Sequence, residues 1–301
     1  MAVVTSSGTS TANQQLEHNL EKKRRFQLLA LIGPGFLWLM LFFLAPLIVI
    51  VVYSFMTPGS TGRPVLPFTF DSYARLFTES LFVNAYLRSI WIGIVTTVLC
   101  LLLGYPLALF IVRQSPQWRT ILLFLVLIPF WTNFLVRTYA WMIILQKNGL
   151  LNAIFQSFGM PAQNMMNTTG AVLLGLVYGE LPFMVLPLYA SIERFDFTLL
   201  EAAADLGANK IRSFIRVMLP LTMPGVAAGS VLVLIPTIGQ FVVSDLLGGA
   251  KVDLLGNLLQ RLFQRSNPPN WPLGSAMALM FMIVLTVAVI IYFRSTTEED
   301  R

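Results

Sequence analysis

The sequence predicts an all-α integral membrane protein with six transmembrane helices. Hydrophobic residues make up 56% of the 301-residue chain and charged residues only 11%, well below the roughly 25% charged residues of an average soluble domain. Six apolar segments are each long enough to cross about 30 Å of hydrocarbon as a helix. We place these segments at Leu28–Phe55, Ser89–Val112, Thr120–Leu145, Ala171–Ser191, Leu221–Leu247 and Leu273–Phe293.

The segments divide the chain into a membrane domain with a tail at each end. Residues 1–27 are polar and end in basic residues, residues 28–293 hold the six spans, and residues 294–301 form a short C-terminal tail. The first apolar run exceeds the ~7–15-residue core of a signal peptide, so we expect a retained span. Cys100 is the single cysteine, which excludes an internal disulfide and a zinc motif.

The basic residues indicate the orientation of the chain. Lysines and arginines are more numerous on the side of the membrane that holds the N-terminus, so both termini are expected in the cytoplasm of a bacterial cell, at its inner membrane. The net charge of +6 could suggest a nucleic-acid partner. The basic residues lie at the ends of apolar segments and form no stripe, so we expect no such partner.

The loop at 192–220, between the fourth and fifth segments, is long and polar. Thr198 and Glu201 have capping-box spacing, which predicts the start of a helix. Gly207 is suited to a left-handed helix stop. The apolar pattern of Lys210–Met218 predicts a second helical stretch, and we expect it to end at Pro220. The loop therefore predicts a helix–glycine–helix elbow outside the bilayer.

Two interpretations of this elbow are equally consistent with the pattern alone. Its apolar face could dock into a groove of another protein, or it could rest on lipid. A resemblance favours docking. The elbow resembles the "EAA" coupling loop of ABC importer permeases, in which a helix sits in a cleft of the ATPase subunit, at Glu201, Ala202, Ala203, Gly207, Leu219 and Pro220.

Further segments resemble the polyamine branch of this family, the spermidine/putrescine permeases. They are Pro129–Trp141, Leu181–Tyr189 and Val243–Lys251, and the similarity extends from the first span onward. The resemblance implies half of a path for polyamines, a second related permease, two ATP-binding subunits, and a periplasmic or lipid-anchored substrate-binding protein. The chain has no Walker sequence. We therefore expect no cofactor and no enzymatic activity in this chain, with ATP and Mg bound by the partner ATPase subunits.

Three charged residues fall inside the predicted spans, where they are costly and often functional. Glu180 lies about ten residues into the fourth span, ~15 Å deep, with Tyr178 close by. An acid beside an aromatic ring suits an ammonium group, so both are candidates for the substrate path. For Asp245 we also favour the path, because Pro236 and Gly239 weaken its helix. Arg137 is the candidate for a structural ion pair, with Asp245 or a neighbouring subunit.

The aromatic residues Trp131, Tyr139 and Trp141 are also candidates for a wall along the path. Packing at the membrane interface is an equally good interpretation. A different substrate of the importer remains open, such as an organic cation, an aminophosphonate or ferric ion. A secondary transporter is the alternative of another class, but the chain shows neither inverted repeats nor its own coupling-ion site.

Overall fold

The computed structural model describes residues 8–298, and among them the side chains of 31–249, 251–287 and 289–290. The ends of both predicted tails, residues 1–7 and 299–301, lie outside the described residues. The first helix, α1 (Gly8–Ser54), begins within the segment that we expected as an N-terminal tail.

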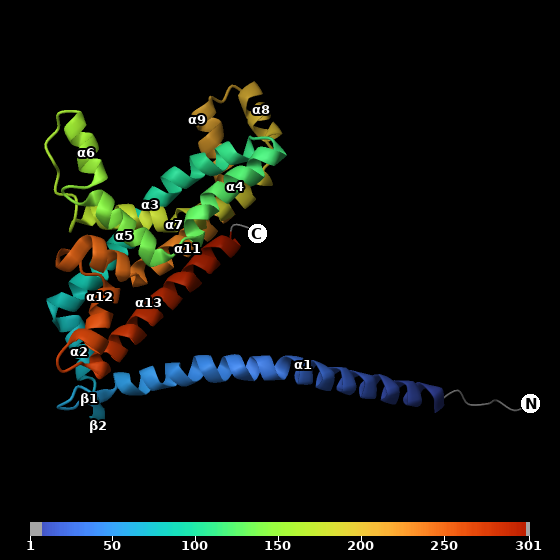
Figure 1. Ribbon diagram of the computed structural model, residues 1–301. Coiled ribbons are helices and arrows are strands. Elements are labelled where there is room, and N and C mark those ends of the chain that lie inside the picture. The colour runs from blue at the N-terminus through green and yellow to red at the C-terminus, as the bar shows by residue number, and fades with distance from the viewer. Residues whose placement is uncertain (1–7, 299–301) are drawn as a thin grey trace, which may run out of the picture.

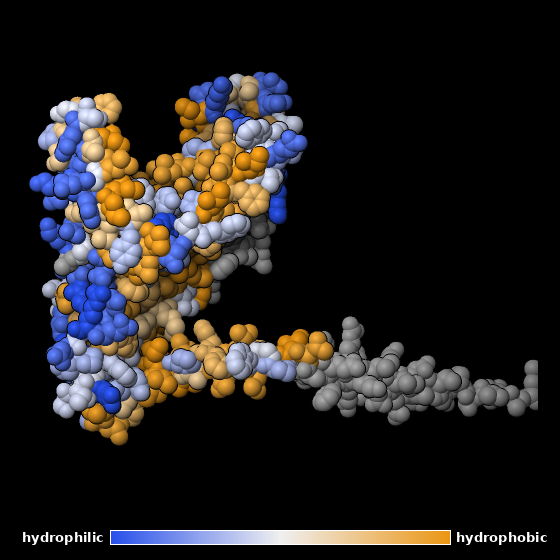
Figure 2. Space-filling model, viewed as in Figure 1, coloured by the Kyte–Doolittle hydropathy of each residue, from blue (hydrophilic) through white to orange (hydrophobic). Residues whose placement is uncertain are grey.

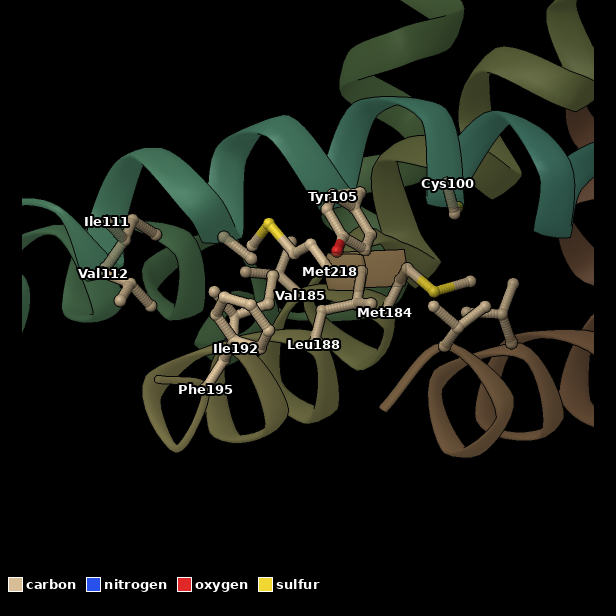
Figure 3. Packing of buried hydrophobic residues seen from close by; sticks show 13 residues of the cluster. Cys100, Tyr105, Ile111, Val112, Met184, Val185, Leu188, Ile192, Phe195 and Met218 are labelled. Carbon is tan, nitrogen blue, oxygen red and sulfur yellow. The ribbon is translucent and has the colours of Figure 1, made fainter. Parts of the chain in front are cut away.

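Three helices form the centre of the protein: α3 (Ser80–Val112), α7 (Thr169–Glu193) and α11 (Met223–Gly239). They pack against one another in all three combinations. The apolar cluster between them includes Tyr105 and Ile111 of α3, which face Leu188 and Ile192 of α7 in Figure 3. The cluster continues to Met218, beyond the end of α7.

Small residues allow α11 to lie close to α7. A Cβ atom at Gly225 would lie 2.4 Å from the Cβ of Ser191, and one at Gly229 would lie 2.7 Å from the Sδ of Met184. The Gly225-x-x-x-Gly229 spacing is therefore a helix-packing motif, as small residues at this interval often are in membranes.

Helix α1 has few neighbours within the chain. It contacts α13 (Trp271–Glu298), and large apolar side chains are exposed along it, from Leu31 to Leu44. Figure 1 shows α1 (blue) extending away from the other helices, and Figure 2 shows the apolar surface of its described part. Such a surface requires lipid or another protein around it.

The third predicted span, Thr120–Leu145, is wrong as a single helix. The chain forms α4 (Pro116–Trp131) and α5 (Phe134–Leu145). The segment Phe134–Ser157, which includes α5, lies at 89° to α4. The side chain of Asn133 causes the restart, because its oxygen accepts from the backbone N–H groups of Leu135 and Val136. A residue of this type at an N-cap begins a new helix.

The fifth predicted span, Leu221–Leu247, is also interrupted. Helix α11 ends at Gly239, shortly after Pro236, and the chain resumes as η2 (Ser244–Gly248). Before α11, the helical chain turns by 69°. This turn lies at Thr222, so the helix does not end at Pro220 as expected but continues through α10 (Leu219–Leu221).

Length and apolar composition alone give three candidate spans among the described residues, at Leu31–Ser54, Ser80–Val112 and Thr169–Glu193. The number is five if each bent helix pair is counted as one span, and Trp271–Val287 is a shorter apolar helix. The fold is thus a mostly helical one with three to five candidate spans.

The shorter elements lie at two ends of the helical bundle. One end carries an antiparallel hairpin and several short helices, namely β1 (Met56–Pro58), β2 (Pro64–Phe68), α2 (Asp71–Thr78), α6 (Leu150–Ser157), η3 (Gly249–Lys251), α12 (Leu255–Gln260) and η4 (Arg261–Arg265). The other end carries α8 (Thr198–Asp205), α9 (Lys210–Ser213) and η1 (Phe214–Met218). Figure 1 shows α8 and α9 on the same side as the end of α13, opposite the hairpin and α6.

Candidate functional site: a surface elbow and an intramembrane cavity

The elbow between α7 and α11 begins with helix α8, which starts at Thr198 as the sequence predicts. Its N-cap residue is Phe197, and a Thr198–Glu201 capping box does not form. Asp196, just before the N-cap, carries the local hydrogen bonds instead. The Asp196 carboxylate accepts from the Thr198 backbone N–H at 3.0 Å and from its hydroxyl at 2.8 Å. These hydrogen bonds hold the pKa of Asp196 below its usual value, because they favour the ionised form.

The turn of the elbow depends on Gly207. Its φ of +84° is in the left-handed region, and its N–H donates to the Ala204 carbonyl at 2.8 Å. A Cβ atom would meet no neighbour within 4 Å there, so the backbone conformation is what favours glycine. Asn209 then caps α9 by accepting from the Arg212 N–H at 2.8 Å.

A π-helical turn connects the elbow to its base. In η1 the Leu219 N–H donates to the Phe214 carbonyl, five residues earlier. Pro220 follows immediately and has no N–H to give to the preceding turn. The ring of Phe214 meets the ring of Tyr105 edge-on, with 5.2 Å between centroids, so the base of the elbow is held by the core.

The outer part of the elbow, α8 and its turn at Gly207, is exposed to solvent. Glu201, Ala202 and Gly207 are exposed, and the apolar side chains of Leu206 and Ile211 are 90% and 71% exposed. Four of the six residues of the predicted coupling motif thus gather on α8 and its turn, while Leu219 and Pro220 lie at the base. This part of the chain has a fixed inner face and an unpartnered outer face.

The second feature is a cavity of about 300 Å³ beside the α4–α5 break. Its lining includes Thr132, Arg137, Trp141 and Tyr178. The rings of Trp141 and Tyr178 meet edge-on with 5.4 Å between centroids. The two residues come from α5 and α7, so the 89° bend is what brings this part of α5 beside α7.

Glu180 lies on α7, two residues beyond Tyr178, and is not among the residues that line this cavity. Its side chain is buried, with 8% of the residue exposed, and its Oε2 atom has no hydrogen-bond partner in the described part of the chain. No ion pair within 4.0 Å joins Glu180 to a cation among the described residues. An unpaired buried carboxylate is costly, which distinguishes Glu180 from the other charged residues.

Arg137 and Asp245 do not pair with each other, contrary to one of the predicted pairings. Asp245 lies in η2 and pairs with Arg265, with 2.9 Å between Oδ2 and Nη2. Arg137 instead donates to the Pro129 carbonyl at 2.8 Å. Twenty positions separate Asp245 from Arg265, so no helical spacing could have indicated this pair.

The predicted aromatic wall is not continuous. Trp141 lines the cavity, whereas Trp131 is 72% exposed on α4, and its ring neighbour is Phe124. Tyr139 is exposed on α5 and does not line the cavity. The turn at Thr132 explains this separation, because it points the end of α4 and the body of α5 in different directions.

A polar contact that the sequence did not indicate joins α4 to α7 near the elbow. Arg119 lies 3.5 Å from the Glu193 carboxylate, and the Tyr189 hydroxyl donates to the same carboxylate at 2.6 Å. Arg119 also donates to the Gln114 carbonyl at 2.9 Å. The base of the elbow and the first turn of α4 are therefore connected.

Comparison with known families shows to which protein family this chain belongs. Residues 100–295 match the family model described as the binding-protein-dependent transport system inner membrane component. The chain belongs to this family. The match covers α4, α5, α7, the elbow and α11, and so includes both the cavity and the predicted coupling motif.

The permease family includes curated relatives that are similar over most of their length. The spermidine/putrescine transport system permease protein PotB of Haemophilus influenzae is 43% identical over 268 residues, which is 88% of this chain and 93% of that protein. PotB of Escherichia coli K12 is 43% identical over 261 residues, 86% of this chain and 94% of that protein. These relatives are transport permeases and not enzymes.

Solved structures share the fold. A chain of a bacterial ABC transporter that imports the acidic polysaccharide alginate has a TM-score of 0.76 at 19% identity, covering 94% of this permease and 99% of that chain. A methionine ABC transporter chain has a TM-score of 0.53 at 17% identity, covering 72% of this permease and 94% of that chain. The chain thus has an ABC permease fold.

Proposed function

We propose that this chain is a permease subunit of an ATP-driven importer and forms half of a path for polyamines into the cytoplasm. The observation that carries the proposal is the 43% identity, over almost all of both chains, to permeases named for spermidine and putrescine. The buried carboxylate of Glu180 and the aromatic cavity both support the same substrate class, since a desolvated acid and an aromatic face both attract ammonium groups.

The proposed topology has six spans, with both termini and the elbow in the cytoplasm. The two bent helix pairs, α4–α5 and α10–α11, each count as one span in this arrangement. Figure 1 supports it, because the elbow and the end of α13 lie on one side and the hairpin and α6 on the other. The arginines of the elbow also agree with a cytoplasmic location.

The elbow couples transport to ATP hydrolysis in this proposal. Glu201, Ala202 and Ala203 on α8 dock into a cleft of an ATP-binding subunit, and Gly207 sets the direction of the chain beyond it. The exposed outer face of the elbow supports the proposal of a protein partner, because docking would bury exposed apolar side chains such as Leu206. ATP and Mg are bound by those subunits.

The complete importer contains a second, related permease, two ATP-binding subunits and a substrate-binding protein on the outer side. Closure of the ATP-binding pair moves the two elbows together and switches access from outside to inside, as rigid bodies rotate about their interfaces. Glu180 and Tyr178 line the cation path at depth. Asp245 lies nearer its outer end, where Arg265 is its present partner.

Uptake of labelled putrescine and spermidine by the reconstituted complex tests the role of Glu180. We expect Glu180→Gln to lower the uptake rate at least about tenfold, because it removes the partner of a desolvated cation. Glu79→Gln is the matched control, since Glu79 is an exposed acid paired with Arg75. Full uptake by Glu180→Gln would contradict the cation path. Uptake of an organic cation, aminophosphonate or ferric ion instead of polyamines would contradict the substrate class.

A further inference from the structure

The side chain of Tyr105 on α3 contacts both ends of the helical base that carries the elbow. This base consists of η1 and α10, residues 214–221. The ring of Tyr105 meets the ring of Phe214, at the start of the base, edge-on with 5.2 Å between centroids. Its hydroxyl lies 2.8 Å from the Oγ1 of Thr222, directly after the base. One side chain therefore holds the base of the elbow at two points.

The hydrogen bonds at Thr222 form a directed chain. The Thr222 hydroxyl has the Met218 carbonyl as an acceptor at 2.9 Å, whereas the Tyr105 hydroxyl has no other partner in the described part of the chain. The arrangement that satisfies both hydroxyls has Tyr105 donating to Thr222 and Thr222 donating to Met218. Thr222 is fully buried and Tyr105 is nearly so, so water cannot replace a lost partner there.

Thr222 is also the residue at which the elbow meets α11. The helical segment Lys210–Leu221 lies at 69° to Met223–Gly239, and only Thr222 stands between them. The backbones of η1 and α10 make few close contacts with α3 or α7. The Ser191 hydroxyl of α7 reaches the Thr222 carbonyl only at 3.4 Å. The hydroxyl of Tyr105 therefore gives this bend a short, buried connection to α3.

Helix α11 extends from this bend towards the opposite end of the bundle. At that end it packs closely on α3, because a Cβ atom at Gly93 would lie 2.8 Å from the Cγ1 of Ile238. At 1.5 Å per residue, Ile238 lies about 24 Å from Thr222 along the helix. Close-packed interiors transmit a displacement rather than absorb it. A rotation of α11 at Thr222 is therefore felt at the far end of α3.

We infer that Tyr105 is a positioning residue that converts movement of the elbow into movement of α11 against α3. Its hydrogen bond fixes the bend at Thr222 to α3, so that a displacement of α8 and α9 turns the chain about a held point. Without this bond the elbow moves while the packing of α11 on α3 stays unchanged. ATP hydrolysis then continues with less transport. This inference rests on the proposed coupling function of the elbow.

The number of putrescine molecules transported per ATP hydrolysed, in the reconstituted complete importer, tests the inference. Tyr105→Phe keeps the ring contact with Phe214 and removes only the hydroxyl. We expect this ratio to fall about threefold, as the loss of one hydrogen bond implies. Tyr86→Phe is the matched control, because the Tyr86 hydroxyl, towards the other end of α3, donates to the Met277 carbonyl at 2.8 Å. An unchanged ratio in Tyr105→Phe, or an equal fall in Tyr86→Phe, would overturn the inference.

Substitution of both partners separates coupling from stability. Thr222→Val leaves the Tyr105 hydroxyl buried without an acceptor, so it should lower both the melting temperature and the transport ratio. Replacing both partners by apolar groups of similar shape costs little stability. The double variant, Tyr105→Phe with Thr222→Val, should therefore regain the melting temperature and keep the low ratio. Thr222→Ser retains the hydroxyl and should keep the wild-type ratio.

Recovery of the transport ratio together with the melting temperature in the double variant would show a merely structural bond and overturn the inference. The wild-type complex separates this failure from that of the proposed function. If the wild-type complex shows no ATP-dependent putrescine uptake, the proposed function itself fails. If its uptake depends on ATP and the double variant has the wild-type ratio, only the role of Tyr105 is rejected.

Discussion

The carboxylate of Asp245 pairs with the guanidinium of Arg265, with 2.9 Å between Oδ2 and Nη2. Both side chains are accessible to solvent, at 36% and 53% exposure. The pair joins η2, which follows the break at Gln240, to η4. The two charged candidates for the cation path therefore differ in kind: Asp245 is paired and accessible, and Glu180 is buried and unpaired.

This difference predicts unequal effects of removing the two charges. Asp245→Asn should lower polyamine uptake less than Glu180→Gln does, because Arg265 already neutralises the charge of Asp245. Exposed ion pairs also contribute little to stability, so the melting temperature of the purified complex should not change. The measurement is the initial rate of polyamine uptake by each variant under the same conditions. A larger loss from Asp245→Asn would contradict this ranking.

Gly207→Ala should weaken the coupling of ATP hydrolysis to substrate. The space around Gly207 is open, so the cost comes from the left-handed backbone, about 1–2 kcal/mol. The outer part of the elbow has little contact with the core, so we expect the melting temperature to change little. Substrate-stimulated ATPase activity is the measurement. Gly207→Asn is the matched variant, because asparagine adopts this conformation more readily, and it should retain more activity than alanine.

Packing between α7 and α11 gives a prediction about stability. Gly225→Ala should destabilise the protein by about 1–3 kcal/mol, because the new Cβ would lie 2.4 Å from the Ser191 Cβ and 2.8 Å from the Pro187 carbonyl. Gly179→Ala is the matched control on α7, where a Cβ meets nothing within 4 Å. Thermal unfolding in detergent measures both. Equal melting temperatures for the two variants would contradict the packing described for α11.

The Asp196 carboxylate, which accepts from Thr198 at the start of α8, should stabilise this helix start by the same amount at all pH values near neutrality. Since the folded-state pKa of Asp196 is lowered by its hydrogen bonds to Thr198, its stabilising effect is present above the usual aspartate pKa. This stabilisation is lost as the pH falls through the pKa that Asp196 has in the folded protein. Asp196→Ala should reduce substrate-stimulated ATPase activity equally at about pH 6 and pH 8, both above that range. A deficit that grows between these two pH values would contradict the assignment of Asp196 as an ionised acceptor of the Thr198 hydrogen bonds.

The sequence predicted the features that depend on local pattern. Apolar runs located α3 and α7, and the start of α8 at Thr198 and the left-handed Gly207 follow from nearby residues. The expected Thr198–Glu201 capping box does not form, because the Thr198 hydroxyl donates to Asp196 instead, and the sequence spacing does not show which of these partners Thr198 takes. The coupling role of this segment stays a prediction.

The features that the sequence did not predict depend on bends and on distant contacts. The segments on both sides of Thr132 are similarly apolar. Average hydropathy therefore could not predict the 89° turn between them. The capping side chain of Asn133 was the available signal. The Asp245–Arg265 pair and the position of Arg137 at the Pro129 carbonyl follow only once these bends are known.

Polyamine uptake with and without ATP inside the vesicles tests the central claim most directly. Proteoliposomes that contain this chain, its partner permease and the ATP-binding subunits, supplied with the binding protein, should accumulate labelled spermidine and putrescine only when ATP is present. Collapse of ion gradients by ionophores should leave this uptake unchanged. Uptake that continues without ATP and stops when an ion gradient is collapsed would contradict the account and indicate a secondary transporter.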